Sequence, residues 1–196
     1  LFPRRRQIAA WKAGHKRECS APGQGAAASA SGQGAAAAQI HRAALGASRG
    51  NAARALPRLT VQQDRVVKRL RELQTVNDWR GVVAIEREAL ALARELRDEH
   101  PRLVCAVYGA LGIGLDQVGD HLRAREMHEQ ALAVSEKLEE RNDEAAACAN
   151  LGSNYHGTGD YVRAREMHNK ALAICKALGD RAGVARACGN LGNCYY

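Results

Sequence analysis

A histidine and a cysteine four residues apart are the first pair of side chains that could do chemistry. The spacing Gln7-x3-Trp11-x3-His15-x3-Cys19 puts all four residues on one face of a helix. Such a pair suits two ligands of one tetrahedral zinc ion. Two ligands cannot close a structural site, so the chain as given is not expected to bind zinc or any other cofactor by itself.

The cysteines favour free thiols over disulfides. No apolar segment of a signal peptide follows the basic run 4–6. Most cysteines also fall in helical patterns, where cysteine is often a small buried hydrophobe. We expect a reducing compartment, the cytoplasm or alternatively the nucleus. The six residues are Cys19, Cys105, Cys148, Cys175, Cys188 and Cys194.

Nothing in the sequence favours an enzyme. There is no nucleophile elbow, no phosphate-binding loop and no recognisable pair of catalytic carboxylates. His128 and His168 recur forty residues apart without an accompanying metal motif, so we expect them to pack between repeats. The segments 123–126 and 163–166, both Arg-Ala-Arg-Glu, could recognise acidic groups, but a solvated helix face with local Arg–Glu pairs is favoured.

Charge and composition divide the chain into parts. The net charge of +8 comes from residues 1–58, which carry ten basic groups and one acid, whereas residues 59–196 are close to neutral. Residues 1–20 are basic, residues 21–57 are rich in Ala, Gly and Ser and are predicted to be a disordered linker, and a helical pattern fills residues 58–196. Nucleic-acid binding through the basic segment is therefore only a third option, and no run of apolar residues predicts a membrane span.

An internal repeat is the strongest signal in the sequence. Gly119-Asp120 begins GDHLRAREMHEQALAVSEKL, and forty residues later Gly159-Asp160 begins GDYVRAREMHNKALAICKAL, with twelve of twenty positions identical. A weaker copy begins near Asn77. A fixed period of this length indicates stacked supersecondary units, here about 60–100, 101–140, 141–180 and a truncated helix 181–196.

Each unit is predicted to contain two helices. First helices are expected at about 60–75, 102–118, 143–157 and 183–196, and second helices at about 79–97, 121–138 and 161–178. At Gly119-Asp120 and Gly159-Asp160, glycine can adopt a positive φ and aspartate can cap the next helix. Pro101 stands where a helix can start.

The spacing Cys148-x2-Leu151-Gly152-x2-Tyr155, followed by Ala164-x3-His168-x2-Ala171, resembles the tetratricopeptide repeat. The resemblance covers about 77–196 and is nearest to the forty-residue, Leu-Gly-Asn type of scaffold proteins. It implies an all-α fold, a right-handed α-solenoid of antiparallel helix pairs. Gly112, Gly152 and Gly192 would lie where two helices touch.

The pattern around His15 and Cys19 resembles the closing half of a MYND zinc finger. That family binds two zinc ions through seven cysteines and one histidine. Arg6 and Phe2 occupy positions where the family has cysteines, and the earlier ligands are missing. The resemblance implies zinc binding only if a longer protein supplies those ligands.

The tetratricopeptide resemblance implies a groove lined by the first helices, which holds a protein or peptide partner. The residues assigned to it are Asn150, Ser153, Arg186, Asn190 and Asn193. Asparagine amides can grip a peptide backbone, and an arginine can hold a carboxylate. The alternative is that Asn150 and Asn190 cap or bridge neighbouring helices. In the preceding unit, 101–140, Ala110 and Ile113 would make the groove more apolar toward the N-terminus.

The favoured function is a non-enzymatic scaffold that binds a peptide through the repeats. The alternative is a zinc-finger adaptor that recruits Pro-rich partners, with the repeats adding avidity. The sequence leaves the oligomeric state open.

Overall fold

The computed structural model of the chain describes residues 58–195. In this range every regular element is a helix. The helices are α3 (Val61–Thr75), α4 (Trp79–Ala84), α5 (Glu86–Glu95), α6 (Pro101–Gln117), α7 (His121–Lys137), α8 (Arg141–Gly157), α9 (Tyr161–Ala177) and α10 (Arg181–Asn193). The all-α class is confirmed, and helix bounds lie close to those predicted, with one exception near residue 85.

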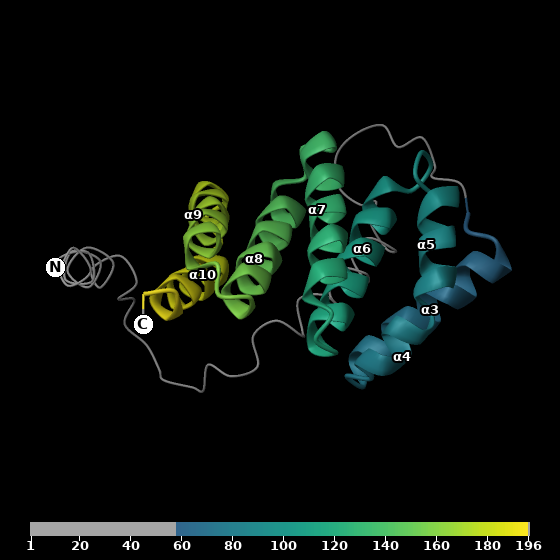
Figure 1. Cartoon of the computed structure of the whole chain (residues 1–196). Helices are drawn as coiled ribbons and strands as arrows, with labels where there is room; N and C mark the ends of the chain where they lie inside the picture. Colours follow the sequence, from purple (N-terminus) through teal and green to yellow (C-terminus); the bar gives the residue numbers. More distant parts are fainter. Residues whose placement is uncertain (1–57, 196) are drawn as a thin grey trace, which may run out of the picture.

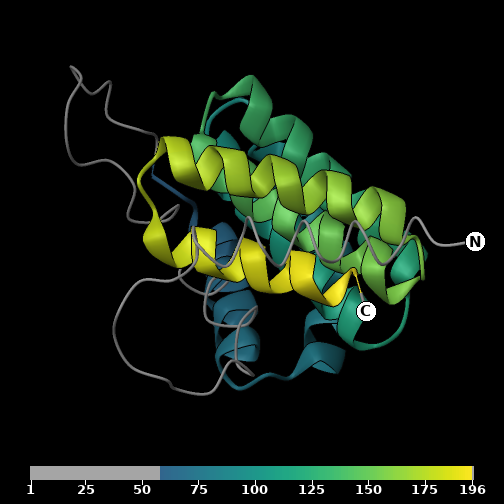
Figure 2. The ribbon, with the colours of Figure 1, turned by 90° about the vertical axis from the view of Figure 1, so that its left-hand side faces the viewer.

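The helices stack in chain order. Figure 1 shows α3–α5 at one end, then α6, α7 and α8, with α9 and α10 at the other end. Consecutive helices pack against each other, and the first helices α6 and α8 are also in contact. Seen from the C-terminal end, α9 and α10 run side by side (Figure 2). This arrangement of packed helix pairs is the predicted solenoid.

The glycine-aspartate turns within the pairs have the predicted geometry. Gly119 and Gly159 have φ of 89° and 83°, a region that side chains disfavour. The carboxylate of Asp120 accepts a hydrogen bond from the backbone N–H of Arg123, at 3.2 Å, and so caps α7. Asp160 caps α9 in the same way. These short turns connect the two helices of each pair and let them run antiparallel.

The second helix of the first unit is divided, which the sequence pattern did not predict. The expected helix 79–97 is interrupted at Ile85, whose φ and ψ are −98° and 11°. Gly81 and the β-branched residues around Ile85 have low helix propensity. A methyl group on Gly81 would also overlap Leu73 and Asp78. Close packing thus keeps a glycine in this short helix.

The main hydrophobic core surrounds α6. Residues 103–112 of this helix are all buried, and side chains from α3, α4, α5 and α7 pack around them. At the centre of each later pair, a glycine on the first helix faces a histidine on the second. A methyl group at Gly112 would overlap the His128 ring, and one at Gly152 would overlap the His168 ring. The predicted close approach at these glycines is confirmed.

Within the described residues, no helix combines the length and apolarity that a membrane span needs.

Candidate functional site

The five residues predicted to line a groove lie on two first helices. Asn150 and Ser153 are on α8, and Arg186, Asn190 and Asn193 are on α10. The two equivalent asparagines, Asn150 and Asn190, are half-buried, and the other three residues are exposed. All five side chains therefore remain at the surface of the helix stack.

No contact among the described residues supports the alternative role of Asn150 and Asn190, which is to cap or bridge neighbouring helices. Both lie inside helices rather than at a cap. Among the described residues, no side chain or backbone group bonds to either side-chain amide. Ser153 is different, because its hydroxyl donates to the carbonyl of Ala149 at 3.0 Å. The amides of Asn150 and Asn190 keep their full hydrogen-bonding capacity for a ligand.

The unit 101–140 does not extend the polar positions of this surface. Ala110, which corresponds to Asn150, is 1% exposed and belongs to the core around α6. Ile113, which corresponds to Ser153, is half-buried. The accessible polar positions are thus limited to α8 and α10.

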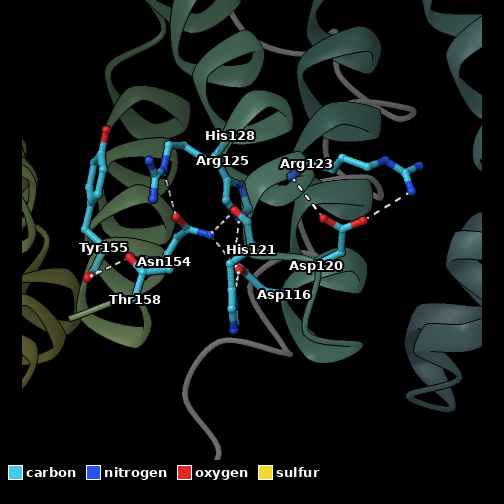
Figure 3. A network of polar contacts seen from close by, with 9 residues as sticks. All are labelled: Asp116, Asp120, His121, Arg123, Arg125, His128, Asn154, Tyr155 and Thr158. Carbon is cyan, nitrogen blue, oxygen red and sulfur yellow. Dashed lines mark hydrogen bonds and ion pairs between the residues drawn. The ribbon is translucent and has the colours of Figure 1, made fainter. Parts of the chain in front are cut away.

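A polar network joins α6, α7 and α8, and the sequence reasoning did not identify it (Figure 3). Its centre is the carboxylate of Asp116 near the end of α6. One oxygen accepts from Asn154 Nδ2 at 2.7 Å and from His121 Nδ1 at 3.0 Å. The other accepts from His128 Nε2 at 3.1 Å. One carboxylate therefore ties a first helix to its own second helix and to the next first helix.

The surroundings keep Asp116 ionised. Burial alone would raise the pKa of this carboxyl, but the hydrogen bonds from His128, His121 and Asn154 outweigh it. The net effect is a pKa below the ordinary value. The same amide of Asn154 also donates to the backbone carbonyl of His121 at 2.9 Å. Asn154 is therefore the asparagine that bridges neighbouring helices, not Asn150.

In the pair formed by α8 and α9, different residues occupy the positions equivalent to Asp116 and His121. His156 corresponds to Asp116, and Tyr161 corresponds to His121. The two rings form an edge-to-face contact with centroids 5.3 Å apart. Burial and the nearby His156 lower the pKa of His168 from 6.5 to about 4. Because no carboxylate replaces Asp116, this buried imidazole stays neutral.

The histidines lie within helix pairs, so the expectation that they pack between repeats is wrong. His128 and His168 are each 1% exposed and each lies against the glycine of its own pair. A side chain larger than glycine on the first helix would leave no room for the ring. The repeated glycine and histidine are therefore one packing unit.

The two arginines of each Arg-Ala-Arg-Glu segment have different roles. The first arginine pairs with the capping aspartate, as Arg163 does with Asp160 at 3.5 Å. The second stacks on a tyrosine in the next first helix, Tyr155 in α8, or just after it, Tyr195 after α10. The guanidinium carbon of Arg125 lies 4.7 Å from the centre of the Tyr155 ring, and that of Arg165 lies 5.3 Å from the centre of the Tyr195 ring. The local Arg–Glu pairing favoured from the sequence is thus not how these segments are arranged.

A lysine on α9 links three helices. Lys170 Nζ lies 2.6 Å from a carboxylate oxygen of Glu136 on α7 and 3.2 Å from one of Glu144 on α8. Burial would raise the pKa of Glu144, but hydrogen bonds from Arg141 and Lys170 lower it below the ordinary value. This ion-pair cluster is a second connection between successive helix pairs.

No metal site is found among the residues that the structure describes, where no group of three or more histidines, cysteines and acids is placed to hold an ion. The two candidate zinc ligands, His15 and Cys19, lie outside these residues, as do the predicted linker and the zinc-finger remnant. The five described cysteines are buried in or at the ends of helices, and no disulfide joins them.

Asp116 and Asn154 were not predicted from the sequence, because the prediction relied on residues that recur at equivalent positions of successive repeats. Asp116 becomes His156 in the next copy, and Asn154 corresponds to Gly114 and Cys194. A search for positions where two nearly identical copies differ in polarity would have singled both out.

Two comparisons with known proteins bear on this arrangement. None of the curated proteins matches the sequence. Residues 143–196, which include all but the first two residues of α8, the helices α9 and α10, and all five predicted groove residues, match the model of the tetratricopeptide repeat family.

Proposed function

We propose that the protein is a non-enzymatic scaffold that binds a partner peptide across the first helices α8 and α10. The observation that carries the proposal is a pair of unused amides. Asn150 and Asn190 occupy equivalent positions in successive repeats, remain accessible, and have no hydrogen-bond partner among the described residues. Both lie in the segment that matches the tetratricopeptide repeat family, whose members generally bind proteins.

The chemistry of this surface suits a peptide backbone. Each amide donates through its nitrogen and accepts through its oxygen, so it can pair with both groups of one peptide unit. Arg186 lies one helical turn before Asn190 and is exposed, so it can hold a carboxylate of the same peptide. Spacing the two amides one repeat apart would favour an extended or helical segment over a small molecule.

A selection from a random-peptide display library tests the proposal with the full chain. We expect selected peptides to bind the wild type, and the variant Asn150→Ala/Arg186→Ala/Asn190→Ala to weaken binding by about tenfold or more, since each lost hydrogen bond contributes about 1 kcal/mol. Helicity measured by circular dichroism should stay unchanged, because these side chains support no helix contact.

A matched control removes similar side chains elsewhere. Arg87 on α5 and Asn169 on α9 are both exposed, and replacing them with alanine should leave peptide affinity unchanged. Equal affinity of the groove variant and the wild type would refute the assignment of the binding surface to α8 and α10.

A further inference from the structure

The second helices α7 and α9 each carry an arginine that is held in place but has no counter-ion among the described residues. Several exposed arginines of the described helices pair with carboxylates. Arg141 lies 2.7 Å from Glu144, and Arg123 pairs with Glu86 and with its capping aspartate. Arg125 and Arg165 have no such ion pair with any described residue, although both are half-buried.

Each of these two guanidinium groups is oriented by its neighbours. Arg125 lies between Tyr155 and Asn154 (Figure 3), and its Nε donates to Asn154 Oδ1 at 3.3 Å. Arg163 flanks the same tyrosine, with its guanidinium carbon 5.7 Å from the ring centre. The stack of Arg165 on Tyr195 repeats this arrangement one unit later. Stacking on an aromatic ring fixes the plane of a guanidinium and leaves its edge able to bind an anion.

Arg125 and Arg165 are two oriented cations, one repeat apart, without an ion pair to any residue from 58 to 195, and they form a surface with a preference for acids. In Arg125, the hydrogen bond to Asn154 uses Nε, so the two terminal nitrogens remain for a ligand. Those nitrogens can meet a carboxylate through two parallel hydrogen bonds. Residues 59–196 are otherwise close to neutral, so the surface lacks the continuous positive charge that would attract a nucleic acid.

We propose that Arg125 and Arg165 form an acid-recognition surface that binds two carboxylate side chains of a partner, one for each repeat. The proposal rests on the peptide-binding function proposed above and adds to it the chemistry of the partner, which is an acidic segment. This surface uses the second helices and is distinct from the asparagines of α8 and α10. It gives a role to the second arginine of each Arg-Ala-Arg-Glu segment.

The test titrates the full chain with a capped oligoglutamate peptide and follows the Nε–Hε signals of nitrogen-15-labelled arginine side chains. Following individual signals separates this surface from the basic residues of the N-terminal segment. We expect the signals of Arg125 and Arg165 to shift with saturation, and an oligoglutamine peptide of equal length to leave them unchanged. Assignment uses the single variants Arg125→Lys and Arg165→Lys.

The affinity of double variants then shows whether binding needs the planar guanidinium groups or only their positive charge. Replacing Arg125 and Arg165 with lysine keeps the charge but removes the planar fork, and should weaken glutamate binding at the remaining Arg163 signal by about tenfold. The matched control, Arg69→Gln/Arg94→Gln, removes two exposed charges from α3 and α5 and should leave that binding unchanged.

Three results would overturn the proposal. The first is that oligoglutamate shifts only arginines of the N-terminal segment. The second is that the lysine and control variants bind with equal affinity. The third is that inorganic phosphate saturates both signals while oligoglutamate does not. In each case, retained binding of display-selected peptides at Asn150 and Asn190 would leave the proposed scaffold function standing.

Discussion

Replacing Asp116 with asparagine should measure how strongly one carboxylate holds two helix pairs together. The substitution keeps the shape of the side chain but removes its charge. The carboxylate accepts three hydrogen bonds, at 2.7, 3.0 and 3.1 Å, from Asn154, His121 and His128. An amide in its place can still accept through one oxygen, but its nitrogen would face another donor.

The magnitude follows from the strength of hydrogen bonds to charged groups, about 1.5–3 kcal/mol each. The three bonds share one group and do not add, and the Asp116 side chain is 19% exposed, which allows partial screening by water. We therefore expect Asp116→Asn to lower the free energy of unfolding by about 2–4 kcal/mol at neutral pH. That is a large part of the stability of an ordinary domain, about 5–15 kcal/mol.

The loss should depend on pH in a defined direction. Because the folded protein lowers the pKa of Asp116, its carboxylate stabilises the fold fully above its ordinary pKa. That contribution disappears as the pH falls through the lowered pKa. The contribution of the Asp116 charge to the difference in stability between wild type and Asp116→Asn should thus be complete at about pH 5 and shrink below about pH 4.

Urea unfolding followed by circular dichroism over this pH range provides the assay. Asp98→Asn is the matched control, because Asp98 is exposed in the turn before α6 and has no ion pair with a described residue. Equal unfolding midpoints for wild type and Asp116→Asn at neutral pH, with equal slopes, would refute the assignment of Asp116 as the centre of the network.

Two further predictions concern the histidines. Gly112→Ala should destabilise the fold by about 1–3 kcal/mol in urea unfolding, because the new methyl group overlaps the His128 ring; Gly109→Ala, which meets nothing within 4 Å, should have no such cost, and equal losses would contradict the packing. His156→Asp should raise the pKa of His168 above about 4 in a nuclear magnetic resonance titration and reduce the loss of stability between pH 6.5 and pH 4. An unchanged pKa would show that position 156 does not act on His168.

The sequence was sufficient for the helices and their turns because those depend on local rules. Gly119 with Asp120, and Gly159 with Asp160, mark positions where backbone geometry and capping need particular residue types. The break at Ile85 was missed because it lies inside an apolar pattern that continues unchanged through it.

The contacts between helix pairs could not be predicted in the same way. Whether Asn150 or Asn154 faces the preceding pair depends on how the helices rotate when they pack, and four residues along a helix change the face only slightly. The partners of Arg125 likewise come from α8 and not from its own helix. Such contacts join residues about thirty positions apart, beyond the reach of any local pattern.

The buried cysteines allow the opening of the helix stack to be detected by chemical labelling. Burial raises the pKa of Cys105 to about 12 and that of Cys148 to about 11, so both thiols are protonated and unreactive at neutral pH. Each becomes a nucleophile only when water reaches its helix. Since Cys105 lies in the pair α6–α7, and Cys148 and Cys175 lie in the pair α8–α9, a thiol-directed reagent would show which of the two pairs opens first.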